Sequence, residues 1–232
     1  RMRAVKDDEE IALMRHAQSI TDAAFQHMLT FIKPGLTEKE IRTELENFMF
    51  SNGADSLAFG SIVASGPNTA NPHAVPSDRV VQRGDFVLMD YGAGYCDYRS
   101  DMTRTVVVGE PTPEQLDLYA LVRRTHEECA AAVHAGVEGN DIFKLSRKII
   151  GDAGYGDYYN HGLGHGVGID IHEMPNFNRS MNIIEAGSVI TIEPGVYLPG
   201  IGGVRLEDYG VVTEDGYEPF TKSTHELQVI DC

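Results

Sequence analysis

The sequence predicts an α+β domain made of two similar halves, in which helices cover hairpins of antiparallel strands. Each half contains a long helical segment, a glycine-bearing break and a shorter helical segment, followed by two strand-like segments that each carry an acidic residue. When the chain is overlaid on itself with a shift of 101 residues, Gly35 falls on Gly136 and Ile41 falls on Ile142. The repetition of helices and strands predicts halves of about 1–110 and 111–232 within a single domain.

The first half begins with residues 7–30, which have acids at their start and the apolar spacing of an outer helix. Thr37 followed by Glu40 is a capping box that opens a second helix, ending near residue 49. A strand-like segment over residues 57–64 and a turn-rich loop over residues 65–79 come next. Residues 86–91 and 101–108 then predict a hairpin with a loose turn around Gly92 and Gly94.

This hairpin carries two aspartates, Asp90 and Asp101, about equally far from its turn. The spacing predicts that the two carboxylates face each other across apolar strands. Such a pair repels, and it is costly to bury unless a positive charge lies between the two groups. A divalent cation would supply that charge.

The second half repeats the pattern. Residues 112–135 predict a third helix, headed by the cap, proline and acid of Thr112-Pro113-Glu114, and residues 141–153 predict a fourth. The segments VITIE (189–193) and VRLED (204–208) flank a turn at Pro199-Gly200. Glu193 and Glu207 are equally distant from Gly200, so a second hairpin would set these two carboxylates opposite each other.

A glycine-rich segment, residues 160–177, lies between the hairpins. Its stretch HGLGHGVG contains too many glycines for a stable helix, and glycines beside His165 leave room for its imidazole and a ligand. In the following IDIH, strand-like alternation would put Asp170 and His172 on one face. A phosphate-binding loop is disfavoured, because GxxxxGK[ST] is absent and the surroundings are acidic.

The carboxylates of the two hairpins and the imidazole of the glycine-rich loop form a candidate metal site. Any one of these acids, taken alone, is more simply explained as a surface residue. Together, four negative charges balance two divalent cations, as in dinuclear sites. Mostly oxygen ligands with one nitrogen favour Mn²⁺ or Co²⁺ over a structural Zn²⁺.

The histidines nearest this site are His73, in the stiff loop NPHAVPSD, and His161 and His172, which bracket the His165 loop. The remaining histidines, in helices or near the terminus, are expected to be ordinary core or surface residues.

Composition excludes several other classes. The chain has 35 acidic and 19 basic residues and a formal charge of −16, which argues against nucleic-acid and anionic-membrane partners. Three scattered cysteines, Cys96, Cys129 and Cys232, form no CxxC pair and indicate the reducing cytoplasm rather than a disulfide framework. Neither a spanning apolar run nor a secretory signal is found. The chain begins at Arg1, as expected for a piece of a longer protein.

These residues lie in motifs that resemble a known family, the Xaa-Pro peptidases prolidase and aminopeptidase P. The resemblance implies their pita-bread (creatinase/aminopeptidase) fold, which has a curved, mainly antiparallel sheet, outer helices and two halves related by a pseudo-two-fold. The matching stretches, which together with the opening RAVKDDEEIALMRHA span essentially the whole chain, are NPHAVPSD, LMDYGAGYCDYRSDMTRT, HGLGHGVGIDIHE, TIEPGVY and VRLEDYGVVTEDG.

Carried over position by position, the resemblance implies that Asp90 binds one metal ion and that His165 and Glu193 bind the other. Asp101 and Glu207 would bridge the two ions. A hydroxide between the ions would attack the carbonyl that precedes proline, and Glu193 would pass the proton to the leaving nitrogen. Among Mn²⁺, Co²⁺ and Zn²⁺, the expected metal is Mn²⁺.

The resemblance also implies roles for residues around the ions. His172 would stabilise the tetrahedral intermediate, and His73 would contact the substrate near the scissile bond. Residues expected to bind substrate or to hold the metal ligands are His161, Arg205, Thr103 and Tyr197. Tyr197 is equally well explained as a packed strand aromatic. Thr103 shares a strand face with Asp101 and could fix that carboxylate by a hydrogen bond.

The motifs also discriminate among relatives of this fold. Methionine aminopeptidases resemble the glycine-rich segment, yet they usually carry glutamine-x-glutamate-histidine where this chain has Arg205-Leu206-Glu207-Asp208. A metal-free, creatinase-like hydrolase and a non-catalytic binding module are disfavoured by the complete ligand set. The choice between Xaa-Pro dipeptidase and Xaa-Pro aminopeptidase stays open. We expect the N-terminal domain of full-length family members to lie outside this chain, and we expect the full-length protein to be a homodimer.

Overall fold

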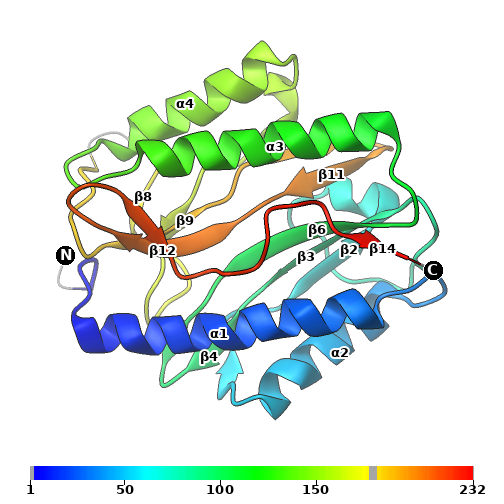
Figure 1. Ribbon diagram of the computed structural model, residues 1–232, viewed down its shortest axis with the longest axis horizontal. Helices are drawn as coiled ribbons and strands as arrows, with labels where there is room; N and C mark the ends of the chain where they lie inside the picture. Colours follow the sequence, from blue (N-terminus) through cyan, green and yellow to red (C-terminus); the bar gives the residue numbers. More distant parts are fainter. Residues whose placement is uncertain (1–2, 178–181, 232) are drawn as a thin grey trace.

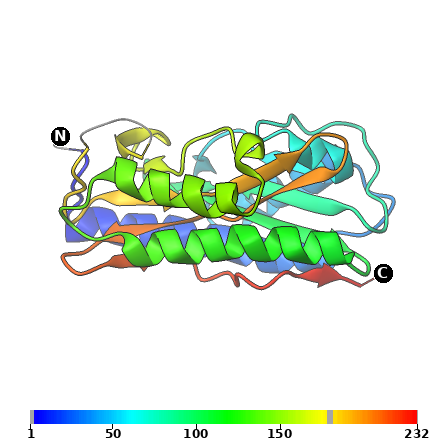
Figure 2. The same ribbon diagram turned by 90° about the horizontal axis from the view of Figure 1, so that it is seen from above.

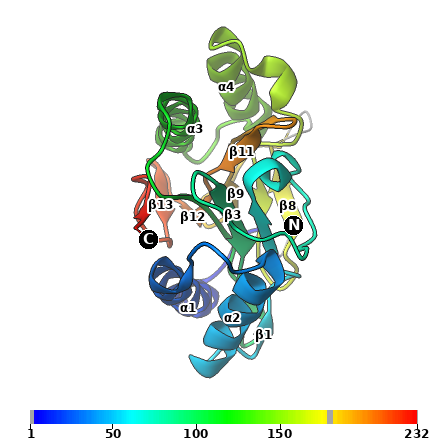
Figure 3. The ribbon, with the colours of Figure 1, turned by 90° about the vertical axis from the view of Figure 1, so that its right-hand side faces the viewer.

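The computed structural model describes residues 3–177 and 182–231, and its strands lie between pairs of helices (Figure 1). In Figure 1, α3 (Pro113–Ala132) and α4 (Gly139–Asp152) lie above the strands, and α1 (Asp8–Phe31) and α2 (Glu38–Ser51) lie below them. Seen from above, α3 runs along the length of the strand layer (Figure 2). The end-on view of Figure 3 also places each helix pair at one edge of the strands.

Three of the four predicted helices begin where the sequence predicts, to within one residue. Asp7, Thr37 and Thr112 each cap a helix in a complete capping box, in which the side chain three residues later binds back to the cap. Residues 38–51 of α2 and 139–152 of α4 are related by the same shift of 101 residues that the sequence suggests. The fourth helix begins at Gly139, two residues earlier than predicted.

Three strands of the first half and one from the end of the chain form a sheet with the order β14-β6-β3-β2. Its strands are β2 (Ile62–Ser65), β3 (Phe86–Tyr91), β6 (Met102–Val108) and β14 (Val229–Ile230). A short 3-10 helix, η1 (Gly66–Ala70), follows β2. Buried side chains of α1 and α2, among them Phe25, Met28 and Leu45, pack on the apolar side chains of these strands. Helix packing therefore fixes the sheet from one side and leaves its other face for a site.

The second half contains a sheet with the order β13-β12-β9-β7-β8. Its strands are β7 (His165–Gly166), β8 (Glu173–Asn176), β9 (Val189–Ile192), β12 (Asp208–Val212) and β13 (Tyr217–Pro219), and η2 (Gly156–Tyr158) precedes them. An isolated bridge between Thr103 and Glu207 joins β6 to the start of β12. Among the described residues, the strand pairs are antiparallel except β14 with β6, so the prediction of a mainly antiparallel α+β fold is confirmed.

The first hairpin differs from the prediction of a loose turn. Its ladder continues past Gly92 into β4 (Ala93–Tyr95) and β5 (Tyr98–Arg99) and closes in a tight turn at Cys96 and Asp97, both with positive φ. Asp90 consequently pairs with Thr103, and Asp101 lies one pair further along the same face. The two aspartates are diagonal neighbours, so the expectation that they stand directly opposite each other is wrong.

The strand predicted over residues 57–64 is also interrupted. β1 (Ser56–Leu57) pairs with β4, whereas β2 begins only at Ile62 and pairs with β3. The residues between them leave the ladder, so one predicted strand serves two different sheets. Phe59 from this interruption lines the cavity described below.

The second hairpin confirms its predicted register. β10 (Gly195–Leu198) pairs with β11 (Gly202–Arg205), and β9 pairs with β12 in the same register, with Ile192 opposite Asp208. Glu193 and Glu207 lie between these two ladders and therefore face each other, as their equal distance from Gly200 predicts.

The strand-like alternation predicted for IDIH is wrong. Residues 168–172 form a bend, in which the Gly168 amide donates to the Asp170 carbonyl at 3.1 Å. The Glu173 carboxylate accepts from the Asp170 amide at 3.0 Å. These local hydrogen bonds replace the ladder that alternation would need.

Two further sequence observations can be compared with the structure. Cys96 is exposed and Cys129 is buried, and both are free thiols, whereas Cys232 lies outside the described residues. Over residues 3–177 and 182–231, no helix has the length and apolar character needed to cross a lipid bilayer.

Candidate metal centre

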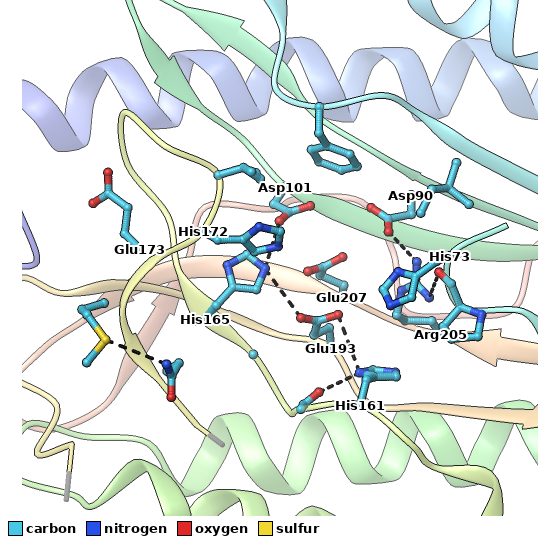
Figure 4. Close-up of a pocket in the computed structure, with 18 residues that line it drawn as sticks. His73, Asp90, Asp101, His161, His165, His172, Glu173, Glu193, Arg205 and Glu207 are labelled. Carbon is cyan, nitrogen blue, oxygen red and sulfur yellow. Dashed lines mark hydrogen bonds and ion pairs between the residues drawn. The ribbon is translucent and has the colours of Figure 1, made fainter. Parts of the chain in front are cut away.

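A cavity of about 730 Å³ opens where the two halves meet, and residues of both halves line it (Figure 4). Asp90 comes from β3, Asp101 precedes β6 and His165 begins β7, while Glu193 follows β9 and Glu207 precedes β12. The predicted site residues that line the cavity are His73, Asp90, Asp101, His161, His165, His172, Glu193, Arg205 and Glu207. The structure thus brings together residues that are more than 100 positions apart in the sequence.

His165 is the centre of the ligand cluster. Its Nε2 lies 3.6 Å from Asp101 Oδ2 and 3.6 Å from Glu193 Oε1. Asp101, His165 and Glu207 each offer one ligand atom within 4.8 Å of the others. The Nδ1 of His165 is 3.0 Å from the Gly166 carbonyl, so Nδ1 is the donor and the lone pair of Nε2 faces the carboxylates. This is the orientation that a metal-binding imidazole needs.

The four carboxylates of the cavity are strained electrostatically. Burial, with repulsion from neighbouring carboxylates, raises the pKa of Asp101 and the pKa of Glu207 well above their usual range. Burial raises the pKa of Glu193 to about 8, and it also raises the pKa of Asp90 although Arg205 opposes this. Four clustered carboxyl groups therefore resist ionisation unless positive charge is added among them.

The donor set fits divalent cations. Within the described part of the chain, Asp90 Oδ1 is buried and has no hydrogen-bond partner, as expected of a ligand atom without its cation. Burial lowers the pKa of His165 to about 4, which keeps its imidazole neutral and able to bind a metal. Four carboxylates and a neutral imidazole match two divalent ions in charge and in ligand type.

Arg205 connects the carboxylates to the residues behind them. Its guanidinium forms an ion pair with Asp90, donates from Nε to Thr103 Oγ1 at 3.0 Å, and donates from NH1 to the Tyr197 hydroxyl at 2.8 Å. Thr103 in turn donates to Glu207 Oε2 at 2.6 Å. Thr103 therefore holds Glu207 rather than Asp101, the carboxylate that the strand face suggested.

His161 and Tyr197 complete this supporting layer. His161 Nε2 lies 2.8 Å from the Tyr197 hydroxyl, and its Nδ1 lies 2.7 Å from the Gly162 carbonyl and 4.0 Å from Glu193 Oε2. Burial lowers the pKa of His161 to about 3, so the ring is neutral. Tyr197 donates to His161 and accepts from Arg205, and it is therefore more than a packed strand aromatic.

The two exposed histidines lie on different sides of the cavity. Figure 4 shows His172 beside His165 and His73 beside Arg205. The rings of His165 and His172 are edge to face, with centroids 4.4 Å apart. The His73 amide donates to Asn71 Oδ1 at 3.0 Å, which fixes the loop that carries it. Both imidazoles are free to meet a ligand that enters from solvent.

Sequence reasoning missed Glu173 and Glu38. Glu173 lines the cavity next to His172, and its Oε2 lies 3.6 Å from the buried Lys6 Nζ. Its place directly after His172 was a signal that could have been used. Glu38 is buried at the start of α2 and accepts hydrogen bonds from Ser65 and Ser77, at the two ends of the His73 loop. An acid in the first turn of a helix looks like an ordinary dipole partner, so no sequence signal separates Glu38 from a surface residue.

A strand layer of this topology, with carboxylates and a histidine converging on a cavity between its halves, defines the class of metal-dependent hydrolytic centres. The profile of metallopeptidase family M24 matches residues 12–214. The chain belongs to metallopeptidase family M24.

Particular relatives support the same family. The chain is 44% identical over 231 residues to an uncharacterised peptidase of Bacillus subtilis, covering 99% of this chain and 65% of the relative. A solved structure described as Xaa-Pro dipeptidase from Bacillus anthracis is 46% identical, with a TM-score of 0.96 over 98% of this chain and 64% of the relative. An X-Pro aminopeptidase from Thermotoga maritima is 39% identical, with a TM-score of 0.96 over 99% of this chain and 65% of the relative.

These comparisons confirm the resemblance to the Xaa-Pro peptidases and the pita-bread fold. The chain spans just under two thirds of the length of these relatives.

Proposed function

We propose that this chain forms the catalytic part of a dinuclear metal-dependent peptidase that cleaves the peptide bond preceding proline. The observation that carries the proposal is the convergence of four carboxylates, two buried and two partly buried, and a neutral imidazole in one cavity. The names of the relatives, Xaa-Pro dipeptidase and X-Pro aminopeptidase, support the substrate class. The substrate would be an Xaa-Pro dipeptide or a peptide with proline at its second position.

In this proposal the metal ligands are the predicted ones. Asp90 would hold one ion, His165 and Glu193 would hold the other, and Asp101 and Glu207 would bind both. When bound, the two divalent ions would balance the charge of the carboxylates, polarise the substrate carbonyl and lower the pKa of water to generate a hydroxide nucleophile near neutral pH.

The chain's own residues would bind the substrate and move its protons. Glu193 carries a proton toward the imino nitrogen of the leaving proline. His172, exposed beside His165, donates toward the oxygen of the tetrahedral intermediate. His73 contacts the substrate from the stiff loop on the other side of the cavity. Arg205 holds Asp90 and Thr103 at fixed positions, while His161 and Tyr197 support Glu193 and Arg205.

Several finer expectations accompany this function. Mn²⁺ is our first choice for both ions, with Co²⁺ and Zn²⁺ as alternatives, because the ligand set accepts all three. The scattered cysteines favour the cytoplasm, and a homodimer is our expectation for the full-length protein. These expectations are tested by metal analysis, localisation and sedimentation of the full-length protein.

The substrate class is tested with a panel of peptides. The Mn²⁺-loaded full-length protein is expected to hydrolyse Xaa-Pro dipeptides or Xaa-Pro-Xaa peptides and to leave Met-initiated peptides without proline intact. A preference for Xaa-Pro dipeptides would indicate a dipeptidase, and a preference for Xaa-Pro-Xaa peptides would indicate an aminopeptidase. If both proline substrates stay intact while Met-initiated peptides are cleaved, the protein is instead a methionine aminopeptidase.

The ligand set is tested by Asp101→Asn. Loss of one bridging carboxylate charge is expected to lower bound metal by at least one equivalent and turnover by at least about a thousandfold. Asp97→Asn is the matched control, because Asp97 lies exposed at the turn of the same hairpin with φ 69°, which asparagine adopts readily. Metal content is measured by elemental analysis. Unchanged metal content in Asp101→Asn would remove Asp101 from the bridging position.

A further inference from the structure

A second group of potential metal ligands lies apart from the cavity. It consists of His126 on α3, Asp208 at the start of β12 and His225 in the segment between β13 and β14. One ligand atom from each residue lies within 4.8 Å of the others. The group does not line the cavity, as far as the described chain shows. A metal bound there would therefore be separate from the dinuclear centre.

His126 has no hydrogen-bond partner that would explain its burial. The residue is 1% exposed, and neither ring nitrogen makes a hydrogen bond to any described residue. Its Nε2 forms an ion-pair contact with Asp208 Oδ2 at a distance of 3.6 Å. Burying an imidazole without a partner costs about 1–3 kcal/mol, so an unsatisfied histidine facing a carboxylate calls for a ligand between them.

Asp208 is oriented so that one oxygen accepts from an arginine and the other faces the two histidines. Arg104, itself buried, donates from NH2 to Asp208 Oδ1 at 2.7 Å. The guanidinium is fixed in turn by the Glu207 carbonyl at 2.7 Å and the Ser223 carbonyl at 2.8 Å. Oδ2 faces both histidines and lies 2.6 Å from His225 Nε2. A hydrogen-bonded carboxylate whose second oxygen points at imidazoles is a common arrangement around protein metal ions.

His225 supplies the second nitrogen and the route to solvent. Its Nε2 donates to Asp208 Oδ2 at 2.6 Å, and a metal ion would take the place of that proton, while Nδ1 lies 3.7 Å from Glu127 Oε1. The side chain is 28% exposed, so an ion and a water ligand can reach the site. The two rings lie edge to face with centroids 4.8 Å apart. Burial also lowers the pKa of His126 to about 4, which leaves its ring neutral at physiological pH.

We propose that His126, Asp208 and His225 form a third, mononuclear metal site that takes Zn²⁺, with water as the remaining ligand. Two imidazole nitrogens and one carboxylate oxygen form the type of ligand set that Zn²⁺ binds in a tetrahedral, open site. The ion would replace the direct contact between His225 and Asp208 and would satisfy the buried His126. The negative charges of Asp208 and of Glu127, which lies beside His225, would balance the charge of the ion. Arg104 contributes one positive charge nearby.

The proposal is tested by counting metal ions. Zn²⁺-equilibrated protein is expected to hold three equivalents, and His225→Gln is expected to hold two, with Zn²⁺ affinity at the third site weakened at least about a hundredfold. His225 is partly exposed, so this variant is expected to fold. His134→Ala, which removes an exposed histidine of the same half, is the control and is expected to keep three equivalents.

A spectroscopic measurement separates this site from the dinuclear centre. Co²⁺ in a tetrahedral site absorbs visible light strongly, and the band assigned to the third site is expected to survive in Asp101→Asn but to vanish in His225→Gln and His126→Asn. Equal metal content and equal spectra in the parent protein and His225→Gln would overturn the proposal, leaving a hydrogen-bonded cluster without metal. Loss of metal from the dinuclear centre alone would affect the proposed peptidase function and not this site.

Discussion

At the scale of single residues, Arg205 connects more of the site than any metal ligand does on its own. It is the only one of the predicted supporting residues that contacts Asp90, Thr103 and Tyr197 at once. Its planar guanidinium presents donors in several fixed directions, whereas the lysine ammonium is a compact charge on a flexible stem. The identity of this cation, and not only its charge, should therefore matter.

Arg205→Lys tests this reasoning. Lysine keeps the positive charge near Asp90 but cannot make the hydrogen bonds to Thr103 and Tyr197 together, so the free energy of unfolding is expected to fall by about 2–3 kcal/mol. Urea denaturation in the presence of a chelator measures the change without contributions from metal binding. Arg124→Lys, at an exposed position of α3, is the control and is expected to change stability by less than about 0.5 kcal/mol. Equal stability of both variants would show that charge alone suffices at position 205.

At the scale of elements, α2 holds the loop that carries His73. Glu38 Oε1 accepts from the Ser65 amide at 2.7 Å, and Glu38 Oε2 accepts from the Ser77 amide at 2.9 Å. The hydroxyls of both serines add bonds of 2.9 Å and 2.6 Å. One buried carboxylate therefore ties the two ends of residues 65–77 to the start of a packed helix, which limits the positions that His73 can adopt.

Glu38→Gln is expected to loosen this loop. The glutamine amide turns one acceptor into a donor that faces amide and hydroxyl donors, so we expect about 2–3 kcal/mol of destabilisation. Hydrogen exchange at the amides of Ser65 and Ser77 should accelerate more than exchange in β3. Glu46→Gln on the same helix loses only an ion pair of 4.0 Å with Arg42 and serves as the control. Unaltered exchange at Ser65 and Ser77 would contradict the anchoring role.

The hairpins show which parts of the site were predictable. Glu193 and Glu207 could be paired from the sequence because Pro199-Gly200 identifies the turn and the ladder continues in one register on both sides of the pair. Asp90 and Asp101 were paired wrongly because a loose turn after Gly92 leaves the point of reversal undefined, and the actual turn at Cys96 and Asp97 pairs Asp90 with Thr103. Glycine signals conformational freedom but does not say where the chain reverses.

Long-range contacts were beyond sequence reasoning for a different reason. The ends of the His73 loop depend on Glu38, and the His172 bend depends on Glu173 and its partner Lys6. Glu38 lies in a helix and Glu173 begins a short strand, and at both places a solvent-exposed carboxylate would be equally consistent with the pattern. Only packing distinguishes them, because burial turns an ordinary acid into an acceptor that several donors share.

At the scale of the whole molecule, the site makes stability depend on metal and pH. Without metal, burial raises the folded-state pKa of Glu193 from 4.5 to about 8, so the stability this group contributes below pH 4.5 is lost as the pH rises toward 8. The buried histidines act in the opposite direction. Burial lowers the pKa values of His126 and His165 from 6.5 to about 4, so their contribution is complete above pH 6.5 and is lost as the pH falls below it. Between pH 6.5 and pH 8, the change in unfolding free energy therefore comes from the carboxyl groups and not from these histidines.

In this window, metal-free protein is expected to lose about 2 kcal/mol of unfolding free energy as the pH rises from 6.5 to 8. Saturating Mn²⁺ should abolish the slope and add about 2.7 kcal/mol at a concentration of 100 times Kd. Thermal or urea unfolding with chelator and with Mn²⁺ measures both effects. Glu193→Gln, which removes one of the titrating carboxyl groups, should reduce the slope of the metal-free protein. An equally steep slope with and without Mn²⁺ would contradict this account.

The bridge between Thr103 and Glu207 also bears on how the protein acquires its metal during synthesis. The two residues are 104 positions apart in the chain, and they meet at the junction of the halves. A chain that has emerged from the ribosome only as far as β6 carries Asp90 and Asp101 but lacks His165, Glu193 and Glu207. Closing a loop of this length is slow compared with forming local hairpins. The proposed dinuclear centre would therefore be complete only after translation has passed β12, so metal capture would follow the folding of both halves.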